Sequence, residues 1–234
     1  QNLNGDVAEF VVFTGVLPNA ERDRVHGYLA HKWGLASIIP GGNPYKTTAP
    51  LASTKAHFVA KDGTSAPYLD MRVEFRNGIP ETDPSTLSKY VQYSDMALWL
   101  DASDGSSVIK DSSNKVSQWA DKSGNGVNVS QSDSAKQPTF TASGLNNLPT
   151  LTFDGSNDYL TSSSMDITQP YSAFLVAKTS GGSGKQYLFD GATSNNSHRS
   201  LISLNNGGKV QLWSGSWGNS NVNTPSGYFT IATV

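Results

Sequence analysis

The sequence predicts an all-β protein, an antiparallel sandwich or jelly roll that carries one short helix. From residue 96 onward, short apolar runs alternate with turns rich in glycine, asparagine and serine. Many short strands separated by turn signals are typical of sandwiches and jelly rolls. Only one stretch of the chain has a clear helical period. The expected strands of the second half cover residues 96–101, 116–120, 149–153, 171–177, 187–189, 201–204, 209–213 and 228–234.

The N-terminal region predicts a strand followed by the helix. Residues 7–13 are mostly β-branched and aromatic, which favours a largely buried strand. Further on, Val25, Leu29 and Trp33 recur at steps of four and therefore lie on one face of a helix. We expect this helix over residues 20–33.

The region that follows has a different composition. Glycine, proline, alanine and threonine dominate residues 35–54, which suggests a linker or a wrapping loop. Strand character returns in residues 55–61 and 68–75, with a turn between them. We therefore expect residues 49–95 to form a linker with a small β element.

The composition narrows the classes of function. Charged residues make up 15% of the chain and the net charge is −2, so no basic excess favours nucleic acid. No polybasic or long apolar run suggests membrane insertion. The absence of cysteine excludes disulfides and thiolate chemistry. A surface rich in asparagine, serine, threonine and glycine suggests a large bacterial extracellular protein, and both chain ends look cut from a longer sequence.

Two groups of motifs resemble the laminin-G-like, concanavalin A-like jelly-roll family. The start of such a domain is matched by Ala97-Leu-Trp-Leu-Asp101, Trp119-Ala-Asp-Lys-Ser-Gly-Asn-Gly126, Pro149-Thr-Leu-Thr-Phe-Asp-Gly-Ser-Asn-Asp-Tyr-Leu160 and Tyr171-Ser-Ala-Phe-Leu-Val-Ala177. The end of such a domain is matched by Leu3-Asn-Gly-Asp-Val-Ala-Glu-Phe-Val-Val-Phe13, Leu17-Pro-Asn-Ala-Glu-Arg22, Gly27-Tyr-Leu-Ala-His-Lys-Trp-Gly-Leu35 and Asn43-Pro-Tyr-Lys46. The resemblance implies a concanavalin-like antiparallel β-sandwich.

The order of these motifs is reversed, because the family's ending comes first. Residues 1–48 would be the C-terminal end of a jelly-roll module and residues 96–234 the N-terminal part of one. The chain is then either a window across two tandem modules or a circularly permuted domain.

This reversed order leads to a prediction about packing. A jelly-roll sheet that lacks a central strand would expose unpaired backbone groups and an apolar face. We therefore expect the strand at 7–13 to pair into a jelly-roll sheet and the helix at 20–33 to pack on it. The sheet belongs either to this chain or to a neighbouring copy. The expected contacts join Phe10, Val12 and Trp33 to Trp99, Phe153 and Phe174.

Two acidic turns are candidate calcium loops. Residues 121–126 offer side-chain oxygens at alternate positions, but Ser132 stands where an EF-hand needs its closing glutamate. An ordinary tight turn explains the same residues and is favoured by their types. Some relatives in the resembled family bind calcium on loops at the rim of the sandwich. The resemblance therefore implies calcium as the cofactor and points to Asp121, Asn125, Asp154 and Asp158 as ligands.

A carbohydrate site is the second candidate. Trp213 and Trp217 flank a Ser-Gly-Ser turn, and an exposed indole can stack on the face of a sugar. Asn219 follows closely and could hydrogen-bond hydroxyl groups. The alternation over residues 209–213 places Trp213 on the polar face of its strand. The alternative is that Trp213 fills the core and Trp217 covers a loop.

No arrangement of residues indicates catalysis. His26 and His31 are five positions apart and so do not share a helix face, and no Gly-x-Ser-x-Gly elbow surrounds a serine. We expect a non-enzymatic extracellular module for adhesion or glycan recognition in a large bacterial repeat protein. The alternatives are a building block of an extracellular fibre and a non-catalytic appendage of a polysaccharide-degrading enzyme. Expected partners are a glycan or cell-surface ligand and neighbouring modules or copies, with no nucleic acid and no membrane insertion.

Overall fold

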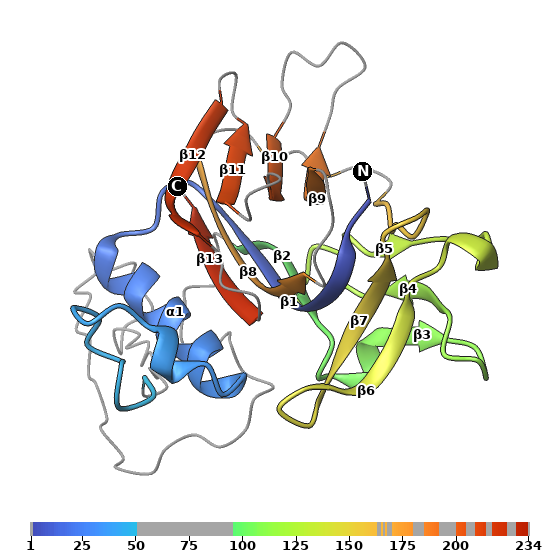
Figure 1. Cartoon of the computed structure of the whole chain (residues 1–234), viewed down its shortest axis with the longest axis horizontal. Coiled ribbons are helices and arrows are strands. Elements are labelled where there is room, and N and C mark those ends of the chain that lie inside the picture. The colour runs from blue at the N-terminus through green and yellow to red at the C-terminus, as the bar shows by residue number, and fades with distance from the viewer. Residues whose placement is uncertain are drawn as a thin grey trace, which may run out of the picture.

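The computed structural model describes residues 2–50, residues 96–162 and, with gaps, residues 165–233 (Figure 1). For strand β12, strand β13 and most of β11 it describes backbone pairing but not side chains. The expected strands at 55–61 and 68–75 lie outside the described residues.

The main sheet contains six strands and is antiparallel throughout. Its order is β13-β8-β1-β7-β6, with β2 as a further partner of β1. The strands are β1 Asn4–Thr14, β2 Met96–Asp101, β6 Thr139–Leu145, β7 Leu148–Asp154, β8 Tyr171–Thr179 and β13 Tyr228–Thr233.

Strand β1 lies inside this sheet and pairs with three other strands. One of its edges pairs with β8 along nearly its whole length, from Gly5 opposite Thr179 to Thr14 opposite Tyr171. Its other edge is shared, because β7 pairs with its first residues and β2 with its last. The expectation that residues 7–13 pair into a sheet is confirmed, and the sheet is formed by this chain.

Two smaller sheets and one α-helix complete the described structure. A four-stranded sheet has the order β12-β11-β10-β9, and a three-stranded sheet has the order β3-β4-β5. Their bounds are β3 Val108–Lys110, β4 Val116–Trp119, β5 Val129–Ser130, β9 Gln186–Gly191, β10 Ser200–Leu204, β11 Lys209–Trp213 and β12 Trp217–Asn223. The helix α1 covers Asn19–Lys32, in close agreement with the predicted 20–33. Over the described residues, the prediction of a mostly β protein with antiparallel sheets and one α-helix is therefore confirmed.

Residues of β1 alternate between two apolar cores on opposite faces of the main sheet. Phe10 and Val12 enter the inner core, which also contains Ile202 of β10 and Val210 of β11. On the opposite face, Val11 and Phe13 enter the helix core beneath α1. This division follows from the two-residue period of a strand. Figure 1 shows α1 and the strands β9–β12 on opposite sides of β1 and β8.

The predicted contacts of the N-terminal segment are confirmed within this chain. Phe153 packs against the inner core that contains Phe10 and Val12. Trp33 lies in the helix core together with Trp99 and Phe174. The period of four in α1 therefore marks its buried face, as expected for an amphipathic helix.

The segment after α1 wraps back over the helix. A Cβ atom at Gly27 would lie 2.4 Å from Cβ of Tyr45, so only glycine permits this close approach. His31 Nε2 lies 2.7 Å from the backbone oxygen of Tyr45, and the Asn43 side chain donates to Asp23. Of the two expectations for residues 35–54, the described part up to residue 50 fits a wrapping loop.

Candidate ligand-binding cavity and buried ionic cluster

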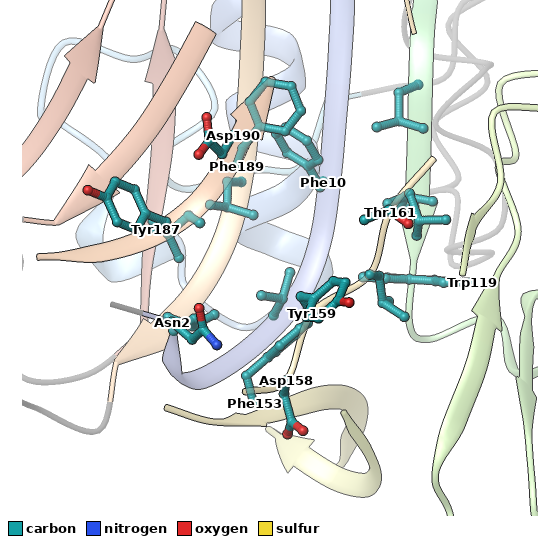
Figure 2. A pocket seen from close by; sticks show the side chains of 18 of the residues that line it. Asn2, Phe10, Trp119, Phe153, Asp158, Tyr159, Thr161, Tyr187, Phe189 and Asp190 are labelled. Carbon is teal, nitrogen blue, oxygen red and sulfur yellow. The ribbon is translucent and has the colours of Figure 1, made fainter. Parts of the chain in front are cut away.

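A cavity of about 360 Å³ opens beside the inner core. Its walls come from the start of the chain and from β1, β2, β4, β5, β7, β8 and β9. Most of the lining is apolar, including Val7, Leu98, Leu175 and Met165. Figure 2 shows Tyr187 and Phe189 of β9 on one side and Trp119 of β4 on the other. Ligand pockets typically have this concave and mostly apolar character.

Aromatic rings are concentrated around the cavity. Phe10 and Phe189 lie with their ring centroids 5.3 Å apart and their planes tilted by 50°. Tyr159 remains 43% exposed, although it is a large ring on the cavity lining. The cavity therefore offers flat apolar surfaces of the kind that stack on other rings.

Two polar groups of the lining are buried without a hydrogen-bond partner among the described residues. They are the indole N–H of Trp119 and the Oδ1 atom of Asp158. The other carboxylate oxygen of Asp158 accepts from the backbone nitrogen of Asp154 at 3.1 Å. Burial raises the pKa of Asp158 above its ordinary value, because water no longer solvates the charged form. Unpaired buried polar groups are rare in folded proteins and call for an explanation.

The predicted metal ligands Asp121 and Asn125 sit in a loop that covers the outer edge of β2. Asp121 accepts from the backbone nitrogens of Trp99, Ser123 and Val127. Asn125 donates through its side-chain nitrogen to the backbone oxygens of Met96 and Ala97. The backbone groups along this edge of β2 would otherwise be open to another strand.

Replacing Asp121 with alanine tests this edge-covering role. We expect the change to lower the free energy of unfolding by about 1–3 kcal/mol, because partly buried backbone donors such as that of Trp99 lose their acceptor. Chemical denaturation with and without calcium measures the loss. Asp111→Ala is the matched control, since Asp111 also accepts backbone hydrogens in a turn but lies in an exposed loop. Equal losses in the two variants would contradict the edge-covering role.

The other predicted metal ligands, Asp154 and Asp158, form a separate turn. Asp154 accepts from the backbone nitrogens of Ser156 and Asn157, and these bonds hold its pKa below the ordinary value. Asp158 is a wall residue of the cavity instead. No described hydrogen bond links this turn to the loop at 121–125. Calcium binding by the four residues stays a prediction.

The predicted carbohydrate residues lie on the hairpin of β11 and β12. Trp213 is the register partner of Trp217, and Gln211 is the register partner of Asn219. The side chains of Trp213, Trp217 and Asn219 lie outside the described part of the structure. Sugar binding by them therefore stays a prediction.

A cluster of buried charges joins α1 to the main sheet on the face opposite the cavity. Glu9 of β1 is fully buried and accepts from Trp33 Nε1 at 2.6 Å and from Trp99 Nε1 at 2.8 Å. Lys32 Nζ lies 2.8 Å from Glu9 Oε2 and 2.8 Å from Asp101 Oδ1. Lys122 extends the cluster, with Nζ 3.0 Å from Asp101 Oδ2.

The pKa values of the two buried carboxyl groups of this cluster are shifted in opposite directions. Burial raises the pKa of Glu9, and the neighbouring Lys32 offsets only part of this effect. Burial also favours a higher pKa for Asp101, but Lys32 and Lys122 outweigh it and hold the pKa below the ordinary value. Two neighbouring carboxyl groups whose pKa values are shifted apart can serve as the acid and the base of one site.

Sequence reasoning did not find the cavity or the cluster. A charged residue in the middle of the apolar run 7–13 was the available signal for Glu9. A tyrosine directly after an acidic turn was the signal for Tyr159. Neither signal reveals its partners, because these come from distant parts of the chain.

Among the described residues, no group of three or more histidine, aspartate or glutamate side chains is placed to hold a metal ion. Within the same residues, no helix has the length and apolar character needed to cross a membrane. Comparison with models of protein families, with curated proteins and with solved structures finds no match.

Proposed function

We propose that the protein is a non-catalytic extracellular module that recognises a glycan through the cavity beside the inner core. The observation that carries the proposal is a mostly apolar, ring-lined cavity with an unpartnered indole N–H at Trp119. The apolar face of a sugar ring can stack on the aromatic side chains. Its hydroxyl groups can accept from Trp119 and donate to Asp158. The volume lies at the lower end of the roughly 300–1,000 Å³ typical of ligand pockets.

We also propose that the fold is a concanavalin-like jelly roll with a permuted chain order. The position of β1 supports this, because it fills the gap between β8 on one side and β7 and β2 on the other. A window across two modules would instead leave β1 to pair with another copy. The alternative in which β1 and α1 pack on a neighbouring copy is less favoured, because both elements pack within this chain.

A glycan array followed by calorimetric titration of the best ligand tests the binding proposal. Trp119→Phe keeps an aromatic ring but removes the N–H, and we expect roughly a tenfold loss of affinity, the worth of one hydrogen bond. Asp158→Asn provides a second probe of the same cavity. Thermal melting of each variant checks that the fold is retained.

A matched variant separates the cavity from the hairpin site. Trp217→Phe changes an indole on β12 and should leave the affinity unchanged. A loss confined to Trp217→Phe would move the site to the hairpin and contradict the cavity. An array on which the folded wild-type protein binds no glycan would reject the function itself.

A further inference from the structure

Lys32 is placed between two carboxyl groups in a site closed to solvent. Its Nζ atom lies 2.8 Å from Asp101 Oδ1 and 2.8 Å from Glu9 Oε2. The side chains of Lys32, Glu9 and Asp101 are 2%, 0% and 1% exposed. Three different elements supply them, namely α1, β1 and β2. The contact between amine and carboxyl group is therefore fixed by the whole fold and not by a local turn.

Burial changes the chemistry of this contact. Removing charges from water carries a cost that favours the neutral forms of an amine and an acid. Glu9 Oε2, 2.8 Å from Lys32 Nζ, is placed to take one proton from the ammonium group, which leaves a neutral amine 2.8 Å from Asp101 Oδ1. A neutral amine is a nucleophile, and a carboxylic acid held against it can be attacked at its carbonyl carbon.

We propose that Lys32 and Asp101 condense to form an intramolecular amide bond, with Glu9 as the catalytic proton carrier. Lys32 Nζ bonds to Cγ of Asp101, and one Cγ–O bond of Asp101 breaks. The ammonium group begins with three hydrogens and the amide keeps one. The other two leave with the carboxyl oxygen as a water molecule. The reaction is therefore balanced without an oxidant, a reductant or a co-reactant.

Glu9 is held in the position that the proton transfers require. Its Oε2 atom contacts Lys32, and the indole N–H groups of Trp33 and Trp99 fix both of its oxygens. It can take a proton from the attacking nitrogen and return it to the departing oxygen of Asp101, which is general acid–base catalysis. The raised pKa of Glu9 brings its proton affinity closer to that of the groups it serves.

Further donors around Asp101 complete the site. Lys122 Nζ lies 3.0 Å from Oδ2, and the Ser103 backbone nitrogen lies 3.0 Å from Oδ1. These donors stabilise the Asp101 carboxylate and so oppose its protonation before attack. They are equally placed to stabilise the negative charge that develops on the acyl oxygen when the amine adds. The proton delivered by Glu9 is therefore essential to the step.

The intact mass of the purified full-length chain, measured after denaturation, tests the proposal. We expect the wild-type mass to be lower than the sequence mass by one water molecule. Tandem mass spectrometry of a protease digest should show a branched peptide that joins Lys32 to Asp101. Lys32→Arg keeps a cation beside both carboxyl groups but removes the nucleophilic amine, so this variant should have its full mass.

Two further variants assign the roles within the site. Glu9→Gln cannot carry the proton, and we expect most of the chain to keep its full mass. Lys136→Arg is the control, because it changes a lysine of an exposed ion pair outside the cluster and should still lose one water. If Lys32→Arg or Glu9→Gln fails to fold, the presence or absence of the branched peptide in the wild-type digest still decides the question.

Three results would overturn the proposal. A folded wild-type chain with its full mass would show that the cluster is ionic only. Loss of water in Lys32→Arg would place the modification elsewhere. A branched peptide that joins Lys32 to Glu9 would reject the roles given to the two carboxyl groups.

Discussion

Replacing Lys32 with methionine is expected to lower the free energy of unfolding by about 3–5 kcal/mol. Methionine retains most of the side-chain volume but removes the one cation that pairs with Glu9 among the described residues. It also leaves Asp101 with Lys122 as its single described cationic partner. Uncompensated buried charge is among the costliest defects in a folded protein. Urea denaturation, monitored by tryptophan fluorescence, measures the change. The variant also lacks the proposed amide, which would increase the loss of stability.

The matched control for this prediction is an exposed lysine in a similar pair. Lys136 lies 2.9 Å from Asp133, and both side chains are more than 40% exposed. Lys136→Met should change stability by less than about 1 kcal/mol, because solvent screens exposed ion pairs. If the two variants lose similar stability, the cluster around Glu9 is hydrated and the argument from burial fails.

Truncating Phe13 to alanine is expected to cost about 3–5 kcal/mol of stability. The ring is fully buried in the helix core, where it meets Phe174 edge-on at a centroid distance of 5.9 Å. Its removal leaves a cavity between β1 and α1 that neighbouring side chains can only partly fill. Thermal and urea unfolding of the purified variant measure the loss.

An exposed apolar residue provides the comparison for Phe13. Ile109 of β3 is 53% exposed, and Ile109→Ala should stay within about 0.5 kcal/mol of the wild type. A loss below about 1 kcal/mol for Phe13→Ala would show that α1 does not seal this core in solution. The proposed packing of the helix on the main sheet would then need revision.

The N-terminal strand and helix could be predicted from the sequence because each has a local period. The run at 7–13 is too apolar for solvent, and the spacing of Val25, Leu29 and Trp33 defines a helix face. Both patterns also require a packing partner. We therefore predicted that they pack on residues of the second half, and the structure confirms this packing. The family resemblance added the identity of that partner, although no comparison supports the family itself.

The site could not be predicted in the same way, because its chemistry arises between distant segments. Glu9 meets Trp99 across β1 and β2, and Trp119 meets the cavity only when β4 lies beside the main sheet. The sequence instead drew attention to asparagine and aspartate in turns. For Asp121 and Asn125, the structure shows that such residues can cover a strand edge through their own hydrogen bonds.

The central position of β1 also determines how the chain can fold during synthesis. β1 precedes β8 in the chain by a long stretch of sequence, since Gly5 pairs with Thr179. At roughly 5–20 residues per second, β8 follows β1 by on the order of 10–40 s. Throughout that delay the edge of β1 that pairs with β8 has no partner strand, although β2 can pair with the other edge once it is made. The nascent chain therefore presents an apolar strand with one unpaired edge during that interval, and residues 7–13 are the segment where we expect a chaperone to bind.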